Sequence, residues 1–326
     1  MLRSSFFLGA LCALCALWAL GTASACAQAA YPSRPITLVV PFTAGSGTDI
    51  GARVLAKDLT DILKTPVIVD NKQGANGALG TAAAARAKPD GYTLLIGSAT
   101  TNAVNFSFFP ARLGYAPGSF EMVAGLGTSP ISLYVAANAK WRNLADLMAY
   151  GKAHPNALRC GSGNAVTQVA CEIFRKSAGI DAVTVPYKSN PQSLADLAGG
   201  HIDFAFSDAS VAKVFIDGNK LKPLAVAAAR RYPATPDVGT FREQGIADFE
   251  ITGWTAVFVP AGTPAPIVET LHAAIRKSSA SPESVQLRAS SGTQPLAFNL
   301  EEGRRFAREE IARWARYVKN SGVKPE

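Results

Sequence analysis

The stretch ITLVVPFTAGSGTDI, from Ile36 to Ile50, decides the fold of this chain. It begins with Ile36–Val40, a short apolar run rich in β-branched residues, which predicts a buried strand. Pro41 cannot donate a hydrogen bond to a neighbouring strand, so the strand should end there.

The glycine-rich loop after this strand predicts a binding site. Gly45 and Gly47 allow the backbone to approach another group closely, and Thr48 is a candidate N-cap for a following helix. A helix N-terminus presents unpaired N–H groups and the positive end of a dipole, so this segment should attract an anion.

The first 29 residues read as a secretory signal peptide. Arg3 supplies the positive charge, Phe6–Leu20 is the apolar region, and small residues follow, with cleavage expected after Ala27 or Ala29. The apolar run is shorter than the ~20 residues that a membrane-spanning helix needs. Cys26 leaves a lipoprotein as the alternative. We therefore expect a periplasmic protein.

Charge and cysteine content narrow the function classes. Removing Arg3 takes the net charge from +8 to +7 (8 − 1), but no basic run exceeds pairs such as Arg230–Arg231, which argues against nucleic acid and favours small anions or a membrane partner. Of five cysteines, Cys160 and Cys171 remain after cleavage. They form a disulfide or stay as two buried thiols, and no further ligands stand nearby for zinc.

A strand and helix alternation follows the opening stretch. Strands at 67–69 and 92–96 flank a helix at 81–87, which predicts parallel strands with helices on both faces. Ligands of such sheets lie beyond the carboxyl ends of the strands. The loops at 42–48 and 97–102 should therefore face one crevice.

The same alternation starts again in the second half. A strand at 158–160 enters the glycine loop Gly161–Asn164, and a helix follows over 166–177, so a second helix N-terminus should face an anion. Single strands at 131–136 and 254–259 lead into this unit and back. Residues 103–128 are predicted to be less regular, and two helices, about 265–278 and 301–320, close the chain.

This layout predicts an α/β protein of two lobes with the ligand between them, each lobe a mostly parallel sheet flanked by helices. We expect lobe 1 to comprise residues 30–130 and 256–326, and lobe 2 residues 131–255.

The sequence contains no evident catalytic motif. There is no Gly-x-Ser-x-Gly motif, no pair of carboxylates stands in an evident general acid/base arrangement, and the three histidines have no metal-ligand companions at useful spacing. Gly45, Gly47 and Gly51, with Asp70 downstream, imitate a dinucleotide fingerprint, but the spacing is loose and Asp49 would repel a pyrophosphate. We expect Asp49 to cap N–H groups instead, leaving the loop amides for the ligand. No enzyme, metal or cofactor is predicted; the alternative is an exported α/β enzyme acting on a small anion.

Several motifs together resemble the periplasmic solute receptors of tripartite tricarboxylate transporters, first described as Bordetella uptake gene products. The similarity runs over nearly the whole mature chain and is carried by YPSRPITLVVPFTAGSGTDIGARVLA (31–56), VIVDNKQGANGALG (67–80), PDGYTLLIGS (89–98), VPYKS (185–189), LAGGHIDFAFSD (197–208) and WTAVFVPAGTP (254–264). The resemblance implies a monomeric type II (Venus-flytrap) binding protein without catalysis. Its ligand would be a di- or tricarboxylate, an acidic amino acid or an aromatic acid, delivered to membrane transporter subunits or a sensor.

The resemblance also implies which residues hold the ligand. Lobe 1 would contribute Phe42, Thr43, Ala44, Gly45, Ser46, Ser98, Thr100 and Asn102. Lobe 2 would contribute Gly163, Asn164, Ala165, Tyr187, Lys188, Ser189 and Asp208. Relatives commonly carry a glycine where this chain has Ser46, and paired glycines where it has Ser189 and Asn190. These departures suggest a ligand that differs from the common ones.

Overall fold

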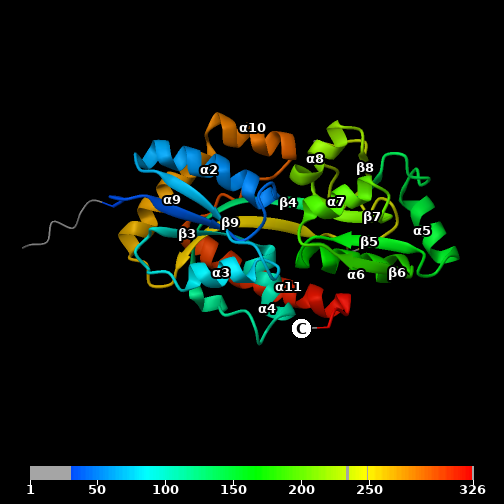
Figure 1. Cartoon of the computed structure of the whole chain (residues 1–326), viewed down its shortest axis with the longest axis horizontal. Coiled ribbons are helices and arrows are strands. Elements are labelled where there is room, and N and C mark those ends of the chain that lie inside the picture. The colour runs from blue at the N-terminus through cyan, green and yellow to red at the C-terminus, as the bar shows by residue number, and fades with distance from the viewer. Residues whose placement is uncertain (1–30, 233–234, 248, 325–326) are drawn as a thin grey trace, which may run out of the picture. The chain divides into compact units, whose positions relative to one another are not determined.

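The computed structural model describes residues 31–232, 235–247 and 249–324, so the signal peptide expected at 1–29 lies outside them. All the elements below belong to one body that begins at Arg34. Its strands lie side by side in the order β2-β1-β3-β9-β4-β7-β5-β6, and β8 also pairs with β4. Figure 1 shows this path running through two lobes.

Lobe 1 holds three parallel strands and two antiparallel strands, β4 and β9, beside them. β1 pairs in parallel with β2 and β3, and β9 runs antiparallel to both β3 and β4. These strands are β1 (Ile36–Val40), β2 (Val67–Asn71), β3 (Thr93–Ser98), β4 (Phe120–Ala136) and β9 (Thr252–Pro260). The helices are α2 (Gly47–Leu63), α3 (Ala78–Ala85), a π-helical turn η1 (Thr100–Val104), α4 (Asn105–Phe108), a short turn η2 (Pro117–Ser119), α9 (Ala265–Ser279), α10 (Pro282–Ser291) and α11 (Leu300–Ser321).

Lobe 2 repeats the arrangement on a smaller scale. β5 pairs in parallel with β6 and β7, while β7 and β8 run antiparallel to β4. The strands are β5 (Leu158–Ser162), β6 (Ala182–Pro186), β7 (Phe204–Asp208) and β8 (Leu221–Val226). The helices are α5 (Leu144–Ala153), α6 (Ala165–Ala178), α7 (Asn190–Ala198) and α8 (Ala209–Asp217).

Strand β4 connects the lobes. Its residues 120–130 pair with β9, and Ile131–Ala136 pair with β7 and β8. Helix α11 packs against β4, α4 and α6, so it contacts both lobes. The two-lobed α/β fold is therefore confirmed, although the sheets are mixed at β4 and β9; the lobe boundaries at 130 and 255 stay a prediction.

Predictions that rest on a few neighbouring residues are confirmed for two elements and wrong at others. β1 spans the predicted residues Ile36–Val40, and the helix expected over 166–177 forms as α6, Ala165–Ala178. The predicted cap of α2 is wrong, because the helix begins at Gly47 and Ser46 caps it. The irregular region predicted over 103–128 is also wrong, because β4 already begins at Phe120. Helices α8 and α10 were not predicted.

A disulfide joins β5 to α6, because Cys160 lies in the strand and Cys171 in the helix. Cys160 and Cys171 are fully buried and their sulfur atoms are joined, 1.96 Å apart. The bond therefore bridges the glycine loop that connects β5 to α6. In the described part of the chain, no helix has both the length and the apolar character needed to cross a membrane.

Candidate functional site

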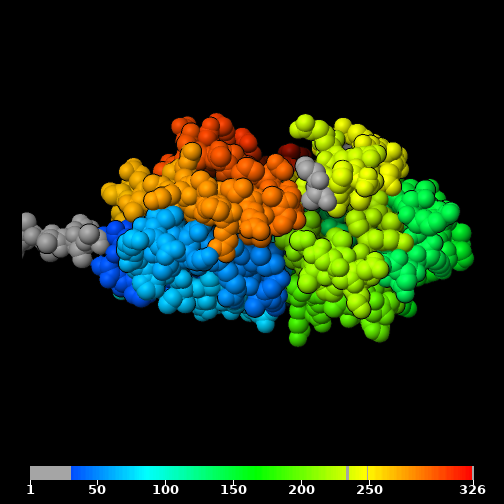
Figure 2. Space-filling view, turned by 90° about the horizontal axis from the view of Figure 1, so that it is seen from above, coloured from blue at the N-terminus to red at the C-terminus, as the bar shows by residue number. Residues whose placement is uncertain are grey.

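A cavity of ≈ 180 Å³ lies where the lobes meet, at the beginnings of four helices. The N-caps of α2, α6, α7 and α8 all line it: Ser46, Asn164, Ser189 and Asp208. Figure 2 shows the two lobes meeting along a seam, with α2, α9 and α10 on one side and α7 and α8 on the other. Four positive dipole ends therefore surround one space.

The loop before α2 is organised by Asp49 rather than left open. The Asp49 carboxylate accepts hydrogen bonds from the Gly45 amide (2.9 Å), Arg53 Nε (2.9 Å) and Asn71 Nδ2 (2.9 Å). Burial alone would raise the pKa of Asp49, but these hydrogen bonds outweigh it and hold the pKa below its usual value. Asp49 thus caps an N–H as predicted, but the N–H is that of Gly45, which is no longer free for a ligand.

Gly47 rather than Gly45 is the position of close approach. A Cβ atom on Gly47 would stand 2.8 Å from Asp208 Oδ1 and 2.8 Å from Ser210 Oγ, across the seam between the lobes. Gly45 instead has a φ of +80° and open space around it, so glycine is required there for conformation alone. The start of α2 and the start of α8 therefore touch through a glycine.

The loop before α6 uses its own side chains in the same way. Thr167 Oγ1 accepts hydrogen bonds from the amides of Gly163 (3.0 Å) and Asn164 (3.1 Å). Asn164 Oδ1 in turn accepts from the Thr167 amide (3.0 Å), which completes a capping box. The amides of the predicted glycine loop are therefore already paired.

The amides that face the cavity unpaired belong to the first helical residues. Within the described residues, no hydrogen-bond partner is found for the backbone N–H of five residues that line the cavity: Gly47, Thr48, Val166, Asn190 and Ser210. They occupy the first or second position of α2, α6, α7 and α8. These positions of a helix have no internal acceptor, so an anion is their natural partner.

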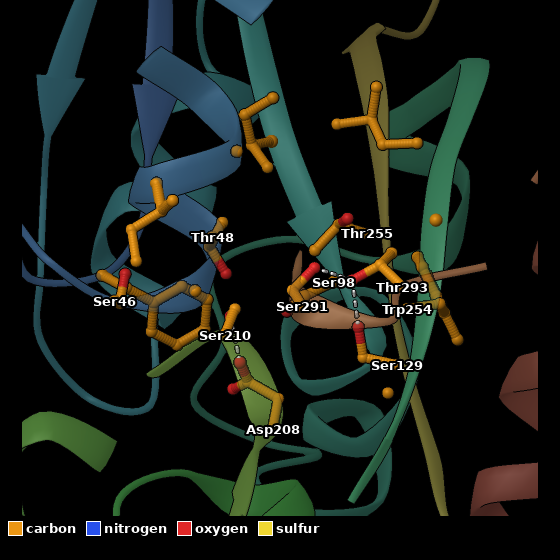
Figure 3. A pocket seen from close by; sticks show the side chains of 18 of the residues that line it. Ser46, Thr48, Ser98, Ser129, Asp208, Ser210, Trp254, Thr255, Ser291 and Thr293 are labelled. Carbon is orange, nitrogen blue, oxygen red and sulfur yellow. Dashed lines mark hydrogen bonds between the residues drawn. The ribbon is translucent and has the colours of Figure 1, made fainter. Parts of the chain in front are cut away.

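Hydroxyl groups line the wall opposite α2. Thr293 Oγ1 pairs with Ser129 Oγ at 2.8 Å and with Ser291 Oγ at 2.9 Å. Figure 3 shows this chain of hydroxyls beside Ser98 and Thr255, while Asp208 and Ser210 lie on the other side of the space. The wall comes from β3, β4, β9, the end of α10 and the segment after it. Ser98 on β3 was predicted, whereas Ser129, Thr255, Ser291 and Thr293 were not.

The cavity includes eight of the fifteen predicted ligand residues. They are Phe42, Ser46, Ser98, Thr100, Gly163, Asn164, Ser189 and Asp208. Seven others do not line it: Thr43, Ala44, Gly45, Asn102, Ala165, Tyr187 and Lys188. Asn102 accepts a hydrogen bond from Thr101 Oγ1 (2.7 Å), and Tyr187 packs on the core of lobe 2, where burial and then Asp196 raise its pKa to about 12.

Charged groups are few in this lining. Among the described residues that line the cavity, Asp208 is the sole carboxylate and Arg288 the sole cation. Asp208 Oδ1 accepts from Ser210 Oγ and, at 3.3 Å, from the Val211 amide. No group of three or more His, Cys, Asp or Glu side chains that could hold a metal is found in the described part of the chain. Backbone amides and hydroxyls therefore dominate the polar surface.

A buried carboxylate positions the one indole in the lining. Trp254 Nε1 donates to Glu310 Oε2 at 2.7 Å, and Trp314 Nε1 donates to the same oxygen at 3.1 Å. Arg313 Nη1 donates to the other oxygen, Oε1, at 2.9 Å. Glu310 is 4% exposed, so helix α11 fixes the cavity wall from behind.

Comparison with known proteins agrees with this architecture. Residues 51–323 match the family described as "Tripartite tricarboxylate transporter family receptor". The chain belongs to this family. It is 33% identical over 307 residues to Protein BugT of Bordetella pertussis (strain Tohama I), with 93% of this chain and 94% of the relative covered. Its members are periplasmic solute-binding receptors rather than enzymes.

Solved structures of similar proteins carry ligands. Rpa4515 of R. palustris, described with adipate, is 30% identical with a TM-score of 0.87, covering 91% of this chain and 100% of that one. MatC of Rhodopseudomonas palustris, described with bound malate, is 30% identical with a TM-score of 0.81, covering 88% and 100%. The family member described here thus shares the whole fold with receptors whose structures hold dicarboxylates.

Proposed function

We propose that this receptor binds a small organic carboxylate between its lobes and presents it to a membrane transporter or sensor. The five unpaired amides at four helix N-termini are the observation that carries this proposal. Each helix end contributes about half a positive charge, so together they attract an anion without a cluster of cationic side chains. The adipate and malate of the related structures are anions of this class.

The ligand contacts follow from the same amides. One carboxylate would accept from Gly47 and Thr48 on one side and from Val166 and Asn190 on the other. Because these amides come from both lobes, binding favours the closed arrangement, which a membrane partner can distinguish from the open one. The same proposal includes a signal peptide at 1–29, export as a monomer, and lobe boundaries at residues 130 and 255.

A thermal-shift screen tests the proposal. The purified protein is heated with di- and tricarboxylates, acidic amino acids and aromatic acids, and with sulfate as an inorganic control. A ligand present at one hundred times its Kd stabilises the folded state by about 2.7 kcal/mol. If no acid stabilises the protein more than sulfate does, the carboxylate-receptor proposal fails; turnover of the acid would favour the enzyme alternative.

A glycine variant tests the location. Gly47→Val places side-chain atoms against Asp208 and Ser210 and blocks the amides of α2, so affinity for the identified acid should fall at least tenfold. The matched control is Gly118→Val, because a Cβ there meets no atom within 4 Å and the residue does not line the cavity. Equal affinity of the two variants would place the site elsewhere.

A further inference from the structure

The cavity extends beyond the four helix N-termini into lobe 1. This part, which we call the apolar arm, lies among α2, β3, α9 and α10. Its apolar side chains are Ile50, Val54, Leu55, Ile96, Ile275 and Leu287. Apolar walls favour apolar ligand atoms, because water leaves both surfaces on binding. A carboxylate held at the helix ends leaves this space to the rest of the ligand.

Helix α10 forms one side of the arm and runs alongside α2 in the opposite direction. Near its start, Glu283 pairs with Lys57, and Ser281 Oγ donates to Asp58 Oδ2 at 2.7 Å. At its end, Ser291 joins the hydroxyls opposite the start of α2. The arm therefore follows α2 from Thr48 toward Val54, about 9 Å at 1.5 Å per residue.

Arg288, the sole cation among the described residues that line the cavity, belongs to this arm. Arg288 Nη2 donates to the Ser279 carbonyl oxygen at 2.6 Å, at the end of α9. A guanidinium carries five N–H donors, so it can serve a further acceptor. A tricarboxylate would set three negative charges against one cation and the carboxylate of Asp208, which disfavours it.

We propose that the ligand is an extended dicarboxylate of about six to eight carbons in total, with only methylene groups between its two carboxylates. One carboxylate lies at the N-terminus of α2, the chain follows α2 between Val54 and Leu287, and the second carboxylate meets Arg288. This inference rests on the proposed function, since it names the ligand class of the same site.

Isothermal titration with straight-chain acids tests it on the unmodified protein. The probes are succinate, adipate and suberate, with citrate as the tricarboxylate and octanoate as the monocarboxylate. Each methylene added up to suberate should tighten binding about fourfold, the effect of burying one CH₂ group. Citrate should bind weakest. If succinate or citrate binds as tightly as suberate, the inference is overturned while the carboxylate receptor stands; if none of them binds, both fall.

Two variants test the placement. Val54→Phe fills the arm, so it should lower the affinity for suberate at least tenfold and leave the affinity for succinate unchanged. The control Val214→Phe, at a residue on α8 that is 71% exposed, should change neither affinity. Arg288→Gln should lower the affinity for suberate about tenfold, the usual scale for a lost charge-assisted hydrogen bond. The affinity for octanoate, which has no second carboxylate, should not change. Equal losses for the short and the long acid in either variant would refute the placement. The unmodified protein keeps the test decisive if a variant does not fold.

Discussion

Replacing Glu310 by alanine tests how the wall of the cavity is held. The change leaves the indole N–H groups of Trp254 and Trp314 buried without their acceptor. Each unsatisfied buried donor costs about 1–3 kcal/mol, so the free energy of unfolding should fall by about 4 kcal/mol in total. Arg313 adds little, because 35% of its side chain is exposed and water can replace the lost carboxylate.

Equilibrium unfolding in guanidinium chloride, followed by circular dichroism, measures this loss. The control is Glu309→Ala on the same helix, where the side chain is 69% exposed and its ion pair with Arg305 spans 3.9 Å. That change should cost less than about 0.5 kcal/mol. Glu310→Gln keeps an oxygen for the indoles and should lose about 1 kcal/mol. If Glu310→Ala and Glu309→Ala unfold at the same denaturant concentration, the two indole bonds do not stabilise the fold.

Three further predictions concern the loops at the cavity. Ser46→Ala removes the cap of α2 and should lower stability by about 1 kcal/mol, while Ser46→Gly should lose only a few tenths, both measured by urea unfolding. Replacing Cys160 and Cys171 by serine should cost about 3 kcal/mol, and reducing agent should then no longer affect the melting temperature. Asp49 has a lowered pKa, so its stabilising effect is complete above the pKa of the unfolded chain and is lost as pH falls through the folded pKa. The stability gap between wild type and Asp49→Asn should therefore be largest near neutral pH and shrink as the pH falls below the ordinary aspartate pKa of about 3.9. A constant gap would contradict the hydrogen bonds as its cause.

The elements near the first glycine loop could be predicted because their signals are local. A β-branched run, a proline and a capping residue each act within a few positions. The strand β1 before the first glycine loop and the start of α6 after the second therefore follow from sequence. The exact cap of α2 did not, because Ser46 and Thr48 are both competent capping residues and the local pattern does not distinguish them.

The missed elements depend on distant partners. Gly125, Gly127 and Pro130 argue against a strand, yet β4 forms there because β9 pairs along it and Leu296 and Gln294 press against the two glycines. Helix α10 is polar along most of its length and is held by contacts with α2, α8 and α9. These two elements contribute Ser129, Leu287, Arg288 and Ser291 to the cavity, so this part of the candidate site could not be foreseen.

The four caps around the cavity divide the helix amides into two sets. Each cap side chain accepts from the third helical residue, as Ser46 does from Asp49, Asn164 from Thr167, and Asp208 from Val211. The cap side chain does not reach the amides at the first two positions, and those of Gly47, Thr48, Val166, Asn190 and Ser210 stay available to an anion. In the complex that we propose, a bound carboxylate completes the capping of helices from both lobes at once. An acid that contacts the amides of only one lobe forms about half of these hydrogen bonds and does not favour closure of the lobes. Selectivity for the ligand and closure of the lobes therefore have the same physical origin.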